Sequence, residues 1–202
     1  MDMKSIDCKE IGMDVRLMVQ GTPNPNAFKF VLNVPVKSEG NVTYKTPEEC
    51  MDNPLAKAVF EISGHIREVY FFDNYVTVTQ DGLEDWEALE EKIKIAILAK
   101  INNHDPNFKI AVPKKDDYSQ ILRTPEMDRI DAILNDTVRP ALQMDGGDLQ
   151  LVSYKDNVLT VFYQGACGSC PSASMGTLMA IENLLRNEFN PEIVVQLKEG
   201  SY

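Results

Sequence analysis

The chain has 202 residues, of which 44% are hydrophobic and 25% are charged, and its formal net charge is −11. This composition is typical of a soluble globular protein and argues against a disordered one, and no apolar run is long enough to cross a membrane. Both halves of the chain share the acidic excess, so no basic lobe is available for nucleic acid. We therefore expect neither a membrane nor a nucleic acid among the partners.

The first ten residues, which include Cys8, have neither the apolar core of a secretory signal nor the Arg-rich character of a transit peptide. We expect a cytoplasmic location, or the mitochondrial matrix if a transit peptide has been removed. Four cysteines in the chain are too few for a disulfide scaffold. Cys8 and Cys50 each stand alone in the sequence, and both are expected to be ordinary thiols.

The first half of the chain has the pattern of an α+β domain. Alternation of apolar and polar residues predicts strands over residues 15–19, 28–34, 42–44, 66–72 and 75–79. Capping residues and helical spacing predict a short helix after Thr46, a second from Pro54 and an amphipathic helix from Trp86 that covers a sheet. Residues 21–26 are dense in turn formers and should connect the first two strands, with a recognition loop as the alternative.

The second half is predicted to be a separate domain. Residues 107–123 carry a proline and a charge cluster without sustained periodicity, so we place a linker there. The chain then divides into domains at 14–106 and 124–199. The second of them should follow the order helix, hairpin, CxxC turn, helix and strand. The predicted fold class is therefore α+β, in two small α+β domains.

Two features of the second domain depend on local backbone chemistry. Its first helix should begin at Thr124 and should end or kink at Pro140. The sequence Asp145-Gly146-Gly147-Asp148 predicts a tight turn that needs positive φ. Binding of a cation by its two carboxylates is the alternative interpretation.

The chemical centre of the sequence is the stretch Gly165-Ala166-Cys167-Gly168-Ser169-Cys170-Pro171-Ser172. Cys167 and Cys170 are close enough in sequence to bind one metal centre or to react with each other. Three chemistries are therefore open, namely cluster ligation, zinc binding and thiol–disulfide exchange. Pro171 suits the first turn of a helix, which places Cys170 near the N-cap, where the helix dipole favours a thiolate.

The context of the CxxC turn favours one of these chemistries. A thioredoxin-type site normally follows a strand of a βαβ unit. The strands before this turn are joined by two residues and must be antiparallel. This argues against a redox site without excluding it. A closed zinc site needs four ligands, and this part of the chain offers two cysteines and no histidine. Two copies of the turn would supply the four thiolates of an iron–sulfur cluster. The count of ligands thus favours a cluster shared between subunits.

The sequence also resembles a known family. Pro140-Ala141-Leu142, Asp145-Gly146-Gly147-Asp148 and the CxxC stretch, in that order, are similar to the C-terminal domain of the NifU-like (Nfu) iron–sulfur carrier proteins. Residues 22–30, 54–56 and 76–79 resemble the amino-terminal domain of the same family. Two positions depart from its pattern, Ala173 and Phe72. Neither removes a sulfur ligand, although Ala173 removes a hydroxyl that could tune a cluster.

The resemblance implies a carrier and not an enzyme. It implies a [4Fe-4S] cluster held by Cys167 and Cys170 of two chains, with a [2Fe-2S] form left open. It further implies a homodimer in the cluster-bound state, upstream cluster assembly proteins as donors and apo iron–sulfur proteins as recipients. The alternative function is a thiol–disulfide oxidoreductase that uses the same cysteines. The amino-terminal domain would serve in partner recognition or in regulation of the carrier domain.

Overall fold

The computed structural model describes residues 14–110, 118, 121–168 and 173–198. The first half of the chain forms a five-stranded sheet in the order β1-β2-β5-β4-β3, in which each adjacent pair is antiparallel. Its strands are β1 (Leu17–Gly21), β2 (Ala27–Leu32), β3 (Lys37–Tyr44), β4 (Ile66–Asp73) and β5 (Tyr75–Gln80). Asp73 takes a positive φ of 45° in the tight turn between β4 and β5. All five predicted strands are confirmed.

Helices cover one face of this sheet. They are the 3-10 helix η1 (Pro47–Cys50) and the α-helices α1 (Pro54–Phe60) and α2 (Trp86–Ile101). Asn53 caps α1, because its side chain accepts hydrogen bonds from the backbone N–H groups of Leu55 and Ala56. The short helix predicted after Thr46 from its capping residues is only partly right: Pro47 does begin a helix, but that helix is a single 3-10 turn and the Thr46 side chain makes no capping bond.

The first hydrophobic core lies between the sheet and these helices. Phe30 of β2, Phe71 of β4, and Leu89 and Ile93 of α2 are completely buried in it. Cys50 is 1% exposed in the same core and is therefore a buried thiol; that it has no further role stays a prediction. Cys8 lies outside the described residues.

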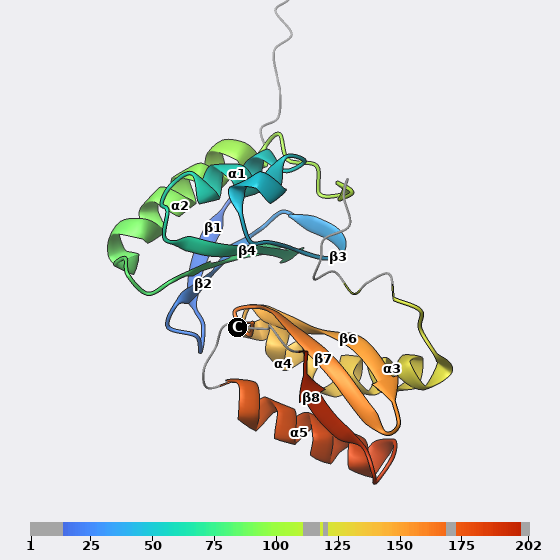
Figure 1. Ribbon diagram of the computed structural model, residues 1–202. Coiled ribbons are helices and arrows are strands. Elements are labelled where there is room, and N and C mark those ends of the chain that lie inside the picture. Colours follow the sequence, from blue (N-terminus) through green and yellow to red (C-terminus); the bar gives the residue numbers. More distant parts are fainter. Residues whose placement is uncertain (1–13, 111–117, 119–120, 169–172, 199–202) are drawn as a thin grey trace, which may run out of the picture.

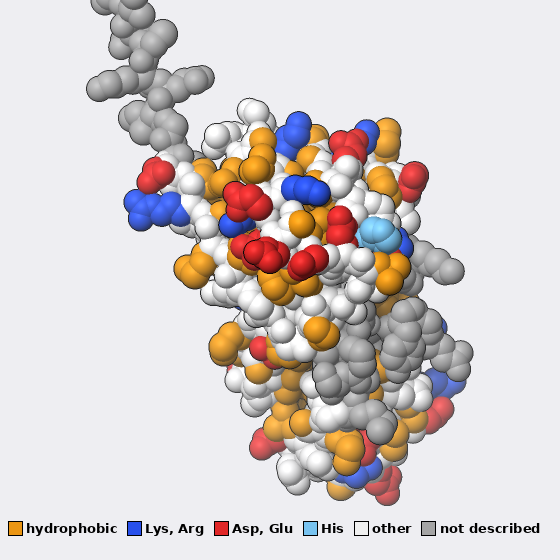
Figure 2. All heavy atoms as spheres, turned by 90° about the vertical axis from the view of Figure 1, so that its left-hand side faces the viewer, with side chains coloured by type: hydrophobic (Ala, Val, Ile, Leu, Met, Phe, Trp, Pro, Cys, Tyr) orange, Lys and Arg blue, Asp and Glu red, His pale blue; other side chains and the backbone are white. Residues whose placement is uncertain are grey.

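The solvent side of α2 is only partly polar. Ile95 and Leu98 are exposed there by 61% and 40%, whereas Leu89, Ile93 and Ile97 of the predicted apolar stripe are buried in the core. Figure 2 shows the corresponding side of the molecule, on which hydrophobic side chains alternate with acidic and basic ones.

The second half of the chain forms a separate three-stranded sheet, in the order β6-β7-β8. Its elements are α3 (Pro125–Thr137), α4 (Arg139–Met144), β6 (Gly147–Lys155), β7 (Val158–Gly165), α5 (Ala173–Glu188) and β8 (Val194–Leu197). Thr124 caps α3 through a hydrogen bond from the Met127 N–H, and α3 ends just before Pro140, as predicted. Ile130, Leu134, Leu149 and Ile181 lie at the centre of a second core, which is separate from the first.

The two sheets face each other (Figure 1). Helices α1 and α2 cover the far side of the five-stranded sheet, and α3 and α5 cover the far side of the three-stranded sheet. Strands β4 and β5 lie against β7. The molecule therefore has four layers, in the order helices, sheet, sheet and helices, with an interdomain contact at its centre.

This architecture confirms the predicted α+β class. The predicted domain limits at 14–106 and 124–199 remain a prediction, since much of the linker lies outside the described residues. Among the residues that are described, no helix combines the length and the apolar character needed to cross a membrane.

A fragment from Thr124 to Tyr202 is expected to fold by itself, because the buried residues of the second core all come from Met127 onward. Circular dichroism of the fragment should show helix and strand, and urea should unfold it in a cooperative transition. A spectrum typical of an unfolded chain would contradict an independent carboxyl-terminal domain.

Candidate metal centre

The first half of the CxxC turn grows directly out of β7. Gly168 N–H donates to the Gly165 carbonyl at 2.9 Å, and Ala166 N–H donates to the Gly146 carbonyl at 3.1 Å. These bonds fold the backbone back on itself immediately after the strand, with Gly165 in the left-handed region at φ 60°. Cys167 is held in this turn and is only 6% exposed. Cys170, the second predicted ligand, lies outside the described residues.

Gly147 is fitted against the sulfur of Cys167. A Cβ atom added to Gly147 would lie 2.5 Å from the Cys167 Sγ and 2.7 Å from the Gln164 carbonyl oxygen. Real Cβ atoms do not approach other atoms so closely, so only glycine allows β6 to pass the cysteine at this point. The Gly146-Gly147 pair therefore shapes the backbone around Cys167, and Gly146 supplies the predicted positive φ, 81°.

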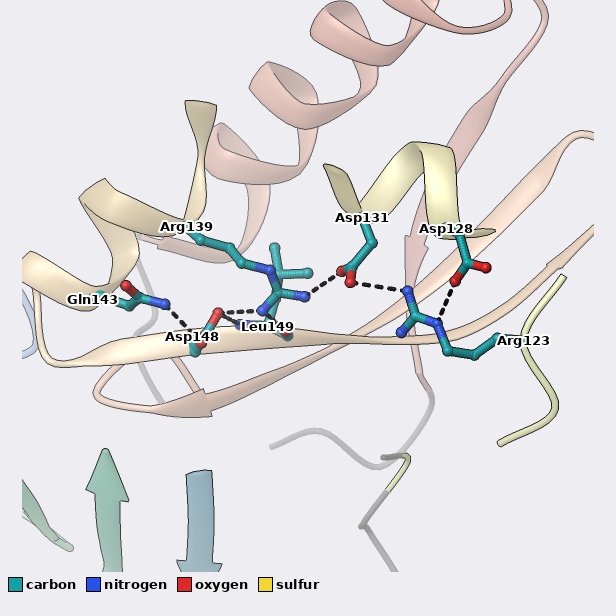
Figure 3. Close-up of polar contacts among 7 residues, drawn as sticks. All are labelled: Arg123, Asp128, Asp131, Arg139, Gln143, Asp148 and Leu149. Carbon is teal, nitrogen blue, oxygen red and sulfur yellow. Dashed lines mark hydrogen bonds and ion pairs between the residues drawn. The ribbon is translucent and has the colours of Figure 1, made fainter. Parts of the chain in front are cut away.

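The carboxylate of Asp148 is buried, and Arg139 neutralises it (Figure 3). The Arg139 guanidinium donates to the Asp148 Oδ1 at 2.6 Å and to the Leu149 carbonyl at 2.5 Å, and it also bonds Asp131 at 2.7 Å. Gln143 donates to the other oxygen of Asp148 at 3.2 Å. Burial opposes the charge of Arg139, but Asp148 and Asp131 outweigh that effect and raise its pKa.

This network bears on the alternative interpretation of the Asp145–Asp148 turn. Because Asp148 is committed to Arg139, it is not available as a cation ligand. In the described part of the chain, no three His, Cys, Asp or Glu side chains come close enough together to hold a metal ion. The turn thus acts through its backbone geometry, which is the interpretation the sequence favoured.

Three tyrosines lie near Cys167, and the sequence did not single them out. Burial raises the pKa of Tyr70, Tyr75 and Tyr163, and the negative charge of a Cys167 thiolate raises all three further. Their hydroxyls therefore stay protonated at neutral pH and can donate hydrogen bonds. Tyr163 belongs to β7, whereas Tyr70 and Tyr75 come from the amino-terminal sheet.

The arrangement of strands around the turn differs from the one assumed for the redox alternative. Strands β6 and β7 form the predicted antiparallel hairpin, but β7 also pairs in parallel with β8, through the connection that contains α5. The CxxC turn therefore does lie at the strand-to-helix junction of a βαβ unit, so this part of the prediction was wrong. The two-residue link requires only that β7 run antiparallel to β6. The strand that pairs with the other edge of β7 comes from later in the chain.

Comparison with known families assigns both halves of the chain. Residues 17–104 match the family model described as the scaffold protein Nfu/NifU N terminal, and residues 130–196 match the NifU-like domain. The chain belongs to the Nfu family. The resemblance seen in the sequence is thereby confirmed, and the second match includes Gly147, Arg139, Cys167 and Cys170.

Individual relatives of this Nfu-family chain are about 31% identical to it. NifU-like protein 4, mitochondrial, of Arabidopsis thaliana is 31% identical over 173 residues, and the human NFU1 iron-sulfur cluster scaffold homolog, mitochondrial, is 31% identical over 178 residues. Each match covers 84% of this chain but only 61% and 66% of the respective relatives. The solution structure of a NifU-like protein from Saccharomyces cerevisiae, at 16% identity, covers 56% of this chain and all of its own, with a TM-score of 0.43.

The close approach at Gly147 leads to a testable prediction. Gly147→Ala should lower the free energy of unfolding by about 1–3 kcal/mol, because the new Cβ meets two backbone atoms, the Gln164 carbonyl oxygen at 2.7 Å and the Cys167 nitrogen at 2.8 Å, as well as the Cys167 sulfur. Urea unfolding of the full chain would measure the loss. Gly176→Ala is the matched control, since no atom lies within 4 Å of its Cβ position and α5 should be stabilised by roughly 0.5–1 kcal/mol. Equal midpoints for Gly147→Ala and the unsubstituted chain would contradict the steric argument.

Proposed function

We propose that this Nfu-family chain binds an iron–sulfur cluster and passes it to recipient proteins. The observation that carries the proposal is the fitted turn: the NifU-like domain holds Cys167 in a fixed backbone loop, with Gly147 shaped to the sulfur. Thiolates are the usual ligands of iron in such clusters. The scaffold role named for the human relative points in the same direction.

Cys167 and Cys170 are the proposed ligands, and two chains would supply the four thiolates that a [4Fe-4S] cluster ordinarily uses. Of the other two cysteines, Cys50 is buried in the core of the other domain and so is not a ligand. A [2Fe-2S] cluster needs the same number of protein ligands and therefore fits the same pair of turns. The cluster is cargo in this proposal, and the protein performs no turnover of its own.

The surroundings of Cys167 suit a bound cluster. The Tyr163 hydroxyl of β7, which remains protonated, can donate a hydrogen bond to sulfur, and such outer contacts tune a cluster without binding iron. The Arg139–Asp148 pair fixes the start of β6, and with it Gly147. The site is therefore rigid on the side of β6.

Recipients in this proposal are apo iron–sulfur proteins, and upstream assembly proteins supply the cluster. A recipient thiolate can compete for iron at a site between two chains more readily than at a site enclosed by one chain. The relatives are named as mitochondrial proteins. For this chain, a cytoplasmic or mitochondrial location remains a prediction.

A thiol–disulfide oxidoreductase is the second candidate, and one observation favours it. The turn lies at the strand-to-helix junction of the β7-α5-β8 unit, where thioredoxin-type sites also lie. Anaerobic incubation with iron and sulfide separates the two functions. A carrier acquires a broad visible absorption, whereas a redox protein only cycles two thiols.

Serine substitution should identify the ligands. Cys167→Ser and Cys170→Ser should each prevent stable cluster assembly, because a hydroxyl is a much poorer ligand than a thiolate for iron in this setting. Cys8→Ser and Cys50→Ser should leave assembly unchanged. Visible absorption and iron content after anaerobic reconstitution measure the effect. Loss of the chromophore in a folded Cys50→Ser protein would show that the ligand set is wrong.

Oligomeric state should follow cluster content. The apo protein is expected to be a monomer and the reconstituted protein a dimer, because the bonds between iron and the thiolates of two chains supply the association. Light scattering coupled to size-exclusion chromatography tests this on both samples, and removal of the iron by a chelator should restore the monomer. A monomer that retains a complete cluster would contradict the shared site.

A further inference from the structure

The outer face of the amino-terminal sheet covers the turn that carries Cys167. Three of its side chains bond backbone carbonyls of the other domain. Asn24 Nδ2 donates to the Ala166 carbonyl at 3.0 Å, and Thr77 Oγ1 donates to the Gly146 carbonyl at 2.7 Å. Lys29 Nζ donates to the carbonyls of Gln143 and Met144 at 2.9 and 3.2 Å.

These bonds reach the carboxyl-terminal end of α4 and the two turns beside Cys167. Gln143 and Met144 are the last two residues of α4, where a helix exposes carbonyls and favours a cation. Gly146 belongs to the glycine turn, and Ala166 immediately precedes Cys167. The contact is thus directed at the backbone of the candidate metal centre.

The glycines of the second domain allow the two sheets to approach. A Cβ on Gly146 would lie 3.0 Å from the Thr77 Oγ1, and a Cβ on Gly165 would lie 2.9 Å from a ring carbon of Tyr70. Both positions also have positive φ. The surface around Cys167 is therefore shaped to receive the amino-terminal sheet as well as to hold the cysteine.

The docked arrangement covers the backbone next to Cys167, whose side chain also belongs to the second hydrophobic core. The residue exposure of Cys167 is 6%, and Tyr70 and Thr77 are exposed by 0% and 1% although both lie on the outer face of their sheet. A cluster shared by two chains requires two such turns to meet across it. A second chain has no access to the backbone at Gly146 and Ala166 while Thr77 and Asn24 are bonded to it.

The contact between the domains is polar and incompletely hydrogen-bonded. The hydroxyls of Tyr70, Tyr75 and Thr79 are buried without a hydrogen-bond partner in the part of the chain that the structure describes. Burial lowers the pKa of Lys29, and Asp145 only partly opposes the effect. Docking of the two sheets therefore removes water from several polar groups and replaces few of the hydrogen bonds that those groups lose. Such contacts are typical of domains that separate and dock again.

We propose that the amino-terminal domain is a reversible latch on the metal centre. Asn24, Lys29 and Thr77 hold the closed state, in which Cys167 is protected. Opening exposes the turn to a second copy of this chain or to a recipient. The physiological meaning of the latch rests on the proposed cluster function, but the closed and open states can be measured without a cluster.

The unsubstituted apo protein provides the first test, in a reducing buffer. The alkylation rates of Cys167 and Cys50 by iodoacetamide are followed separately by mass spectrometry at increasing urea below the unfolding transition. A latch predicts that Cys167 reacts through an opening that depends little on urea, because only the contact between the sheets is exposed. Cys50 should react only with unfolding of its core. An identical urea dependence for the two thiols would overturn the proposal.

A variant provides the second test. Lys29→Met with Thr77→Val removes three donated hydrogen bonds of the closed state from the outer sheet face, and it should raise the alkylation rate of Cys167 about tenfold in buffer without urea. Cys50 should keep its slow rate. Lys92→Met, on the exposed side of α2, is the matched control and should behave as the unsubstituted chain. An unchanged Cys167 rate in the folded double variant would also overturn the latch.

Reconstitution links the latch to the cluster. The double variant should take up a cluster and dimerise faster than the unsubstituted chain, because its turn is exposed for more of the time. If no version of the chain takes up a cluster, the proposed function fails, whereas the alkylation rates still decide whether the latch exists. Faster alkylation of Cys167 with unchanged cluster uptake would overturn the regulatory role of the latch.

Discussion

The close approach of Gly147 to the sulfur of Cys167 is the constraint on which the centre of this molecule depends. Strand β6 begins at Gly147, and it can pass the cysteine only because no side chain intervenes. The register of β6 on β7 pairs Gly147 with Gly165, so the same contact aligns the hairpin and forms the CxxC turn. The geometry of the candidate ligand and the pairing of the sheet are therefore fixed together.

Arg139 secures this arrangement from the side of the helices. The Asp148 side chain is 3% exposed, and an isolated charge there would be costly; the guanidinium, which also bonds Asp131, offsets that cost. Arg139 in addition bonds the Leu149 carbonyl, so α4 is joined to the first residues of β6. A buried ion pair of this kind contributes little net stability, but it specifies how helix and strand meet. A cluster site requires that the CxxC turn be held in a defined position more than it requires additional stability of the fold.

The contact between the domains has a different character. Both hydrophobic cores are complete without it, and the surface between the sheets is rich in threonine, tyrosine, glutamine and lysine. A chain that had only to keep its two domains together would be expected to bury apolar residues there. Polar side chains that bond backbone carbonyls instead give a contact with a defined orientation and modest strength. Such a contact suits a site that must be protected at one time and accessible at another.

The sequence by itself determined the local elements and the candidate chemistry. Asn53-Pro54 and Thr124-Pro125 start helices because their capping side chains and proline geometry act within a few residues. The alternation of apolar residues located the strands, and two cysteines separated by two residues pointed to the candidate metal centre. All of these follow from interactions between near neighbours in the chain, which a sequence displays directly.

Only the tertiary structure decided what lies beside the cysteine. The parallel pairing of β7 with β8 depends on the path of the chain after α5. The sequence pattern does not show this pairing, and for that reason the topological argument against a redox site was wrong. Tyr70 lies 97 residues before Cys167, and Asn24 bonds the Ala166 carbonyl across 142 residues. The recognition loop considered for residues 21–26 thus has a partner within the same chain. Such contacts arise from the docking of two separately formed cores, and no periodicity or spacing along the sequence records how two finished surfaces fit.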